Sequence, residues 1–126
     1  MSLEYTIKYE NPFLRVETQG IFDFVKVFEM WEAIFATCRE HNCFKILGIS
    51  NLEKPVPSMD AYDHLSLLQT TGVTQNHRIA WVAGKPELLE RLRLTETVLR
   101  TRGSINIRAF DSLKAATRWL EKDNSD

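Results

Sequence analysis

The feature that most constrains the fold is a pair of short, almost continuous apolar runs. The runs are CFKILGIS at 43–50 and RIAWVAG at 78–84. Runs of this length and composition predict strands that are covered on both faces, as in a parallel sheet. Each run is followed by a segment with helical spacing of its apolar residues, 58–71 and 86–102, and parallel neighbours need such crossover connections. The two runs therefore predict the centre of an α/β domain.

The rest of the chain extends the same pattern. Residues 5–20 alternate between apolar and polar side chains around a turn at 11–12, which predicts a β-hairpin, and a helical stripe follows from Phe24 to Cys38. A last strand at 105–110 precedes a last helix, whose buried face we expect to include Leu113. Asp23 is the expected N-cap of the first helix, and we expect Pro86 to begin the third helix and Gly103 to end it. We expect a single α/β domain over residues 1–121 with the order ββαβαβαβα, a mixed, mainly parallel sheet of about five strands with helices packed on it, and a polar tail at 122–126.

Composition excludes several classes of protein. The chain has 126 residues, of which 44% are hydrophobic and 26% charged, and no apolar run is long enough to cross a bilayer. The net charge of −1 excludes a strong general attraction to nucleic acid. The first residues do not resemble a signal peptide. We expect a cytoplasmic protein without nucleic-acid partners and without an integral membrane segment.

The two cysteines, Cys38 and Cys43, are expected to be reduced thiols in that compartment. The run CREHNC places His41 between them, and all three side chains are zinc ligands in other proteins. A structural zinc site needs four ligands, and no second cluster of such residues occurs. We expect neither a metal site nor a cofactor.

Reactive side chains are concentrated in SNLEKPVPSMDAYDHL, residues 50–65. This segment follows the carboxyl end of the first apolar run, and ligands of open parallel sheets bind beyond the carboxyl ends of the strands. The segment is therefore a candidate recognition or regulatory site. Its candidate residues are Ser50, Ser58, Asp60, Asp63 and His64.

Residue spacing argues against catalysis in this segment. GISNL at 48–52 resembles the strand end of a G-x-S-x-G nucleophile elbow, but Leu52 occupies the position of the second glycine. Asp63 and His64 are neighbours on a helix and point in different directions. Ser58 has a sufficient structural role as the N-cap of that helix. We expect no catalytic residue.

Aromatic side chains leave two interpretations open. Phe28, Trp31 and Phe35 lie on one helical stripe, and Trp81 lies in the second apolar run. Aromatic residues at this spacing most often form plain core. The alternative is that they line an apolar ligand pocket between helices and sheet.

Two segments, HRIAWVAGKPEL and INIRAFDSLKAATRWL, resemble the SpoIIAA-like family of bacterial STAS-type domains. The resemblance implies a small mixed-sheet α/β domain, often a homodimer, with no known enzymatic chemistry and a fold related to CRAL-TRIO lipid-transfer domains. Relatives include anti-sigma-factor antagonists that are switched by phosphorylation of a serine between the third strand and the second helix. That position is occupied here by Ser58.

These observations give three hypotheses of function. The first is a non-enzymatic binding or regulatory module that contacts an unidentified protein partner through residues 50–60 and the helix at 58–71. The second is a carrier or sensor of a small apolar or lipid-like ligand held between helices and sheet. The third, which we expect least, is an enzyme that uses Asp60, Asp63 or His64.

Overall fold

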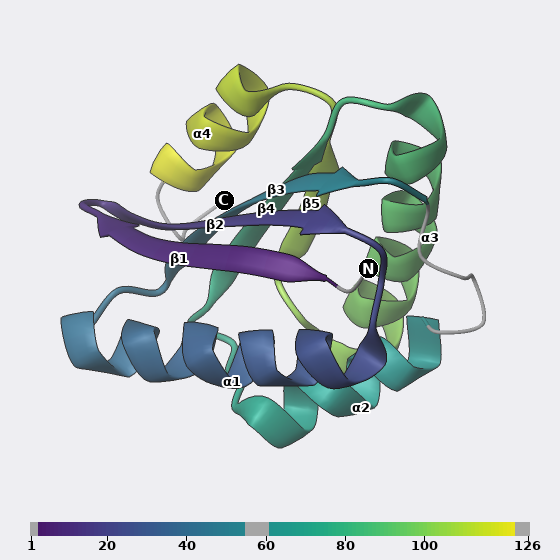
Figure 1. Ribbon diagram of the computed structural model, residues 1–126. Coiled ribbons are helices and arrows are strands. Elements are labelled where there is room, and N and C mark those ends of the chain that lie inside the picture. Colours follow the sequence, from purple (N-terminus) through teal and green to yellow (C-terminus); the bar gives the residue numbers. More distant parts are fainter. Residues whose placement is uncertain (1–2, 55–60, 123–126) are drawn as a thin grey trace.

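The computed structural model describes residues 3–54 and 61–122, which form one sheet with four helices packed on it (Figure 1). The elements follow one another as β1 (Glu4–Glu10), β2 (Phe13–Gly20), α1 (Phe24–His41), β3 (Lys45–Leu52), α2 (Ala61–Thr71), β4 (Arg78–Ala83), α3 (Pro86–Gly103), β5 (Ile107–Phe110) and α4 (Leu113–Glu121). This order confirms the predicted ββαβαβαβα arrangement and the α/β class.

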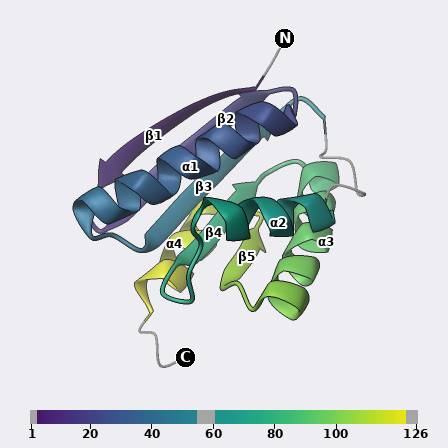
Figure 2. The same ribbon diagram turned by 90° about the horizontal axis from the view of Figure 1, so that it is seen from below.

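The sheet has five strands in the order β1-β2-β3-β4-β5. β1 is antiparallel to β2, and the other neighbours are parallel. Each crossover moves one strand further in the same direction, and right-handed crossovers of this kind leave their helices on one face. α1, α2 and α3 accordingly cover one face, and α4 covers the other (Figures 1 and 2).

Local sequence signals fix most helix ends. The Asp23 side chain caps α1 by accepting from the backbone N–H groups of Val25 and Lys26, at 3.1 and 3.4 Å. α3 begins at Pro86. Proline has no backbone N–H, and an N–H in the first turn of a helix would have no partner within the helix. Ser112 caps α4 by accepting from the N–H of Ala115 at 3.1 Å. These helices therefore begin where short-range chemistry favours it.

Gly103 has a different role from the one that its position in the sequence suggests. α3 ends at Gly103, as expected, but the left-handed conformation that favours glycine at a helix end falls on Ser104, with φ of 55°. A Cβ at Gly103 would lie 2.4 Å from Cδ1 of Leu65 on α2. The glycine is therefore explained by the close approach of two helices.

The two faces of the sheet carry separate apolar cores. The larger core lies between the sheet and α1–α3, and the smaller one lies under α4. Arg78, which is 4% exposed, secures α4 because its Nε and Nη2 donate to the carbonyl of Trp119, at 3.1 and 2.8 Å. Its guanidinium lies 4.1 Å from the centroid of the Trp119 ring. Leu113, which helical spacing placed on the buried face, is 42% exposed.

One close approach dominates the larger core. A Cβ at Gly48 would lie 2.1 Å from Cε3 of Trp81, so the Trp81 indole lies directly over the backbone of β3. Trp81 then meets Trp31 of α1, with ring centroids 5.4 Å apart, and Trp31 stacks on Phe35 at 5.5 Å. Glycine at 48 therefore provides the space for a row of large rings between sheet and helix.

We predict that Gly48→Ala destabilises the protein by at least about 2 kcal/mol, because the added methyl group overlaps the Trp81 ring and the rings cannot shift without breaking their contacts. Gly84→Ala is the matched control, since no atom lies within 4 Å of its Cβ position. The control should change the free energy of unfolding by less than about 0.5 kcal/mol. Urea unfolding of both variants measures this, and equal effects would contradict the packing account.

Candidate functional site

A pocket lies between α1–α3 and the carboxyl-terminal half of the sheet. The side chains leave about 80 Å³ open there, and the space is partly open to the surface. Most of the lining is apolar. The strands contribute Thr18, Ser50, Leu52, Trp81, Ile107, Arg108 and Ala109; α1 contributes Val27, Met30 and Trp31; α2 contributes His64 and Leu68; α3 contributes Leu92, Thr95, Glu96 and Leu99; Leu3 and Phe22 complete the set.

The pocket exists because side-chain size changes along the strands. Large aromatic rings fill the middle of this face of the sheet, ending with the indole of Trp81. Toward the carboxyl ends, Thr18, Ser50 and Ala83 occupy matching positions on β2, β3 and β4. Strand alternation places these three small side chains on the same face as Trp81. They cannot fill the space under the helices that the indole fills one step earlier.

Two buried hydroxyl groups face this pocket from the sheet. Thr18 and Ser50 are 4% and 6% exposed, and both line the pocket. Thr18 Oγ1 donates to the carbonyl of Ile49 at 3.4 Å. Among the described residues, none is hydrogen-bonded to the Ser50 hydroxyl. Polar groups in such positions usually have partners, so this pair marks the polar part of the pocket.

Glu96 closes the pocket toward the edge of the sheet. Its Oε1 accepts from the backbone N–H of Ala109 on β5 at 2.7 Å, and its Oε2 lies 4.0 Å from Nη1 of Arg100. β5 is an edge strand, so this N–H has no neighbouring strand to pair with. Glu96 thus attaches α3 to the sheet edge, which is a structural role for its carboxylate.

The residues predicted from the segment 50–65 separate into three groups. Ser50 and His64 both line the pocket, although they lie on different elements, and His64 is 5.5 Å from Phe22 between ring centroids. Asp63 is exposed at the start of α2. Ser58 and Asp60 lie outside the described residues, as does most of the proposed protein-contact loop. The hypothesis of a protein partner there stays a prediction.

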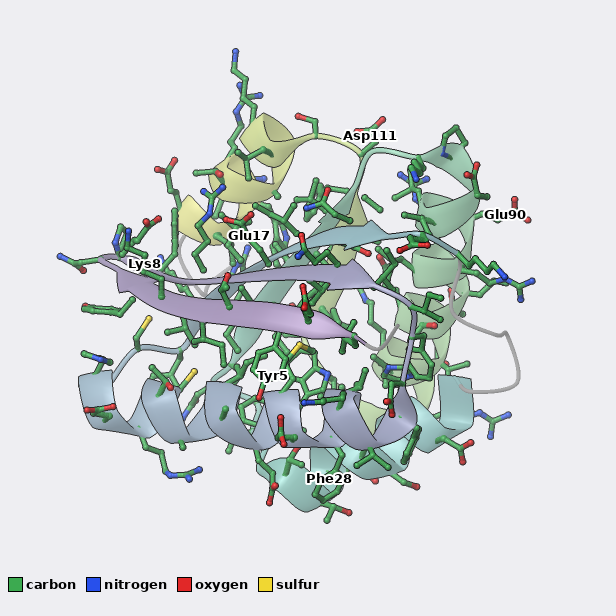
Figure 3. The ribbon with its side chains drawn as sticks, viewed as in Figure 1. Tyr5, Lys8, Glu17, Phe28, Glu90 and Asp111 are labelled. Carbon is green, nitrogen blue, oxygen red and sulfur yellow. The ribbon has the colours of Figure 1, made fainter. Side chains whose placement is uncertain are left out.

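The aromatic candidates also separate. Trp31 and Trp81 line the pocket. Phe35 is fully buried in the core, and Phe28 is partly buried on the side of α1 away from the sheet (Figure 3). Neither phenylalanine contributes to the pocket lining. The helical stripe of α1 thus contributes to the core through Phe35 and to the pocket lining through Trp31.

Several residues that line the pocket were not among the candidates predicted from the sequence, including Thr18, Leu68, Glu96 and Leu99. Only Thr18 carried a usable signal, because the alternation of β2 continues from Leu14 and Val16 to a threonine on the same buried face. The others come from elements whose relative placement depends on the tertiary fold.

A second hollow lies along β1 and has a polar lining. Tyr5 lines this hollow and reaches from β1 to α1, where its hydroxyl donates to Oε2 of Glu29 at 2.9 Å (Figure 3). Lys26 lies 3.9 Å from the same carboxylate. These groups pair with one another at the surface, and exposed pairs of this kind contribute little binding energy.

The cysteine run does not form a reactive site. Cys38 and Cys43 are both buried and free. Burial raises the pKa of the Cys38 thiol to about 12, so it carries no thiolate at neutral pH. His41 stacks on the ring of Tyr9, with centroids 4.2 Å apart. Within residues 3–54 and 61–122, no three histidine, cysteine or carboxylate side chains gather as metal ligands do.

The fold and this pocket define the chain as an α/β domain with an apolar pocket at the carboxyl ends of its parallel strands. Comparison with protein-family models finds no match, and comparison with curated proteins finds none either. Among the helices in the described part of the chain, none has the length and apolar character needed to cross a membrane.

His77 is a buried titratable group at the other end of the aromatic row. It is 4% exposed, its ring packs edge-on against Phe35 at 4.8 Å, and its Nδ1 accepts from the Thr74 N–H at 3.0 Å. That bond requires an unprotonated Nδ1. Burial lowers the pKa of His77 below its ordinary value of 6.5, the Thr74 backbone opposes this in part, and the charge of Arg39 adds to the lowering.

We predict that His77 makes the protein less stable in acid. Because the pKa is lower in the folded state, the unfolded chain binds the proton more readily, and stability is complete above pH 6.5 and is lost as pH falls below it. His77→Gln should therefore lose less unfolding free energy than the wild type between about pH 7.5 and about pH 5.5. Urea unfolding at both pH values measures the difference, and parallel pH profiles would show that His77 is not the group responsible.

Proposed function

We propose that the protein is a binding module for a small apolar ligand, which it holds in the pocket between the sheet and α1–α3. The observation that carries this proposal is the open space beside Trp81 and Trp31, enclosed by apolar side chains from three helices and the sheet. Small-molecule sites are usually concave, largely apolar and supplied with a few polar groups. They also occur at the carboxyl ends of parallel strands.

The energetic argument concerns the space itself. A cavity costs about 24 cal/mol per Å³, so 80 Å³ left open amounts to at most about 2 kcal/mol of lost stability. Protein cores are normally packed without such gaps. A larger side chain than Ser50 would fill part of the space and recover that energy. A ligand that binds there recovers it instead.

The volume restricts the ligand. An engineered apolar cavity of about 150 Å³ holds benzene, and the space here is about half as large. The enclosed part therefore takes a short chain or one edge of a ring. The remainder of the ligand would lie in the partly open side of the pocket. A small molecule fits this description better than a long acyl chain.

Toluene is a suitable probe, and its dissociation constant can be measured from the NMR shifts of pocket backbone amides such as those of Leu68 and Thr95. We expect Leu99→Ala to bind toluene about tenfold more tightly than the wild type, because the larger pocket takes up roughly two more methylene equivalents at about 0.8 kcal/mol each. Leu99 is 1% exposed and lines the pocket.

Leu120→Ala is the matched control. Leu120 belongs to α4 and is fully buried against the opposite face of the sheet, and its truncation should cost roughly 2–5 kcal/mol in stability, as that of Leu99 should. The response of the pocket amides to toluene should then equal that of the wild type. If neither the wild type nor Leu99→Ala shows a toluene-dependent shift of these amides up to the solubility limit, the proposed function is wrong.

A further inference from the structure

The two buried hydroxyl groups of the pocket lie side by side on the sheet. Thr18 and Ser50 are direct partners in the parallel register of β2 and β3. Neighbouring strands are about 4.8 Å apart, and partner side chains stand on the same face. Both residues are more than nine-tenths buried, and both line the pocket. Their oxygen atoms are thus presented together to whatever enters.

The hydrogen-bonding capacity of the pair is specific. The proton of Thr18 is directed to the carbonyl of Ile49, at 3.4 Å between oxygens, so Thr18 Oγ1 is left to accept. No described residue is hydrogen-bonded to the Ser50 hydroxyl, which keeps one donor and its acceptor positions. The sheet therefore offers one acceptor and one donor at neighbouring positions.

We propose that the ligand is a small apolar alcohol or phenol whose hydroxyl group binds between Thr18 and Ser50. A hydroxyl is the simplest group that both donates and accepts. It would donate to Thr18 Oγ1 and accept from Ser50 Oγ, with its apolar body against Trp81 and Leu68. This inference rests on the proposed function, since it specifies the chemistry of the ligand that the pocket holds.

Other head groups satisfy the pair less well. A ketone or an ether only accepts, so it can use Ser50 but not Thr18. A carboxylate would lose its hydration among apolar side chains in a pocket that already contains the carboxylate of Glu96. An ammonium group would need that carboxylate, but Glu96 already accepts from Ala109 and lies 4.0 Å from Arg100.

Phenol and toluene separate the hydroxyl contribution, because the two rings differ in one substituent of similar size. The quantity to measure is the ratio of their dissociation constants, from shifts of the same pocket amides. Ser50→Ala should reduce the preference for phenol by about three- to tenfold, the value of one net hydrogen bond. Thr18→Val, which keeps the shape of the side chain, should reduce it by a similar factor.

Two comparisons sharpen the test. Anisole accepts but cannot donate, so Ser50→Ala should weaken its binding while Thr18→Val should not. Thr37→Val removes a half-buried hydroxyl of α1 that donates to the carbonyl of Ala33 and lies outside the pocket lining. It should leave the phenol preference unchanged. Circular dichroism of each variant checks the fold, and Ser50→Ala alone is sufficient if Thr18→Val does not fold.

The outcomes distinguish the two proposals. If both probes bind and the phenol preference survives in Ser50→Ala and Thr18→Val, or falls equally in Thr37→Val, the hydroxyl assignment is overturned and the apolar pocket stands. If neither phenol nor toluene binds the wild-type protein, both proposals fall. A preference that is lost in the two sheet variants and kept in Thr37→Val supports the assignment.

Discussion

The contact between the Trp81 indole and the backbone of Gly48 is the constraint on which the rest of the structure depends. The ring occupies the space that the side chain of any other residue at 48 would take, and its centroid lies 5.4 Å from that of Trp31. The aromatic row that follows sets the distance between α1 and the sheet. One step further along the strands the side chains are small, and the helices cannot move closer because the rings hold them apart. The pocket is a consequence of this mismatch in size.

The two faces of the sheet differ in how completely their helices are packed against them. Under α4, aliphatic residues form the smaller core, and the buried guanidinium of Arg78 holds the end of the helix through the Trp119 carbonyl. A cation at a helix carboxyl terminus is also favoured by the helix dipole. Under α1–α3, by contrast, packing is completed at the amino ends of the strands and left open at the carboxyl ends. We therefore place the proposed binding function on the face of the sheet that α1–α3 cover.

The fold was predictable because it follows from local periodicity. The two apolar runs at 43–50 and 78–84 gave the central strands, and Asp23 and Pro86 marked helix starts correctly. The helix end at Gly103 was predicted, but the reason for a glycine there is the close approach of Leu65, which no local pattern contains. The pocket was only half predictable for the same reason. Trp31 and Trp81 stand out as aromatic residues, whereas Glu96 and Leu99 join them only when α3 folds over the sheet.

The most direct test of the account is a crystal structure of the protein under xenon pressure, because xenon enters apolar cavities that the protein leaves open and needs no polar partner. The account predicts a xenon atom between Trp81, Leu68 and Leu99. A pocket in which these side chains close on one another and no xenon binds would contradict it.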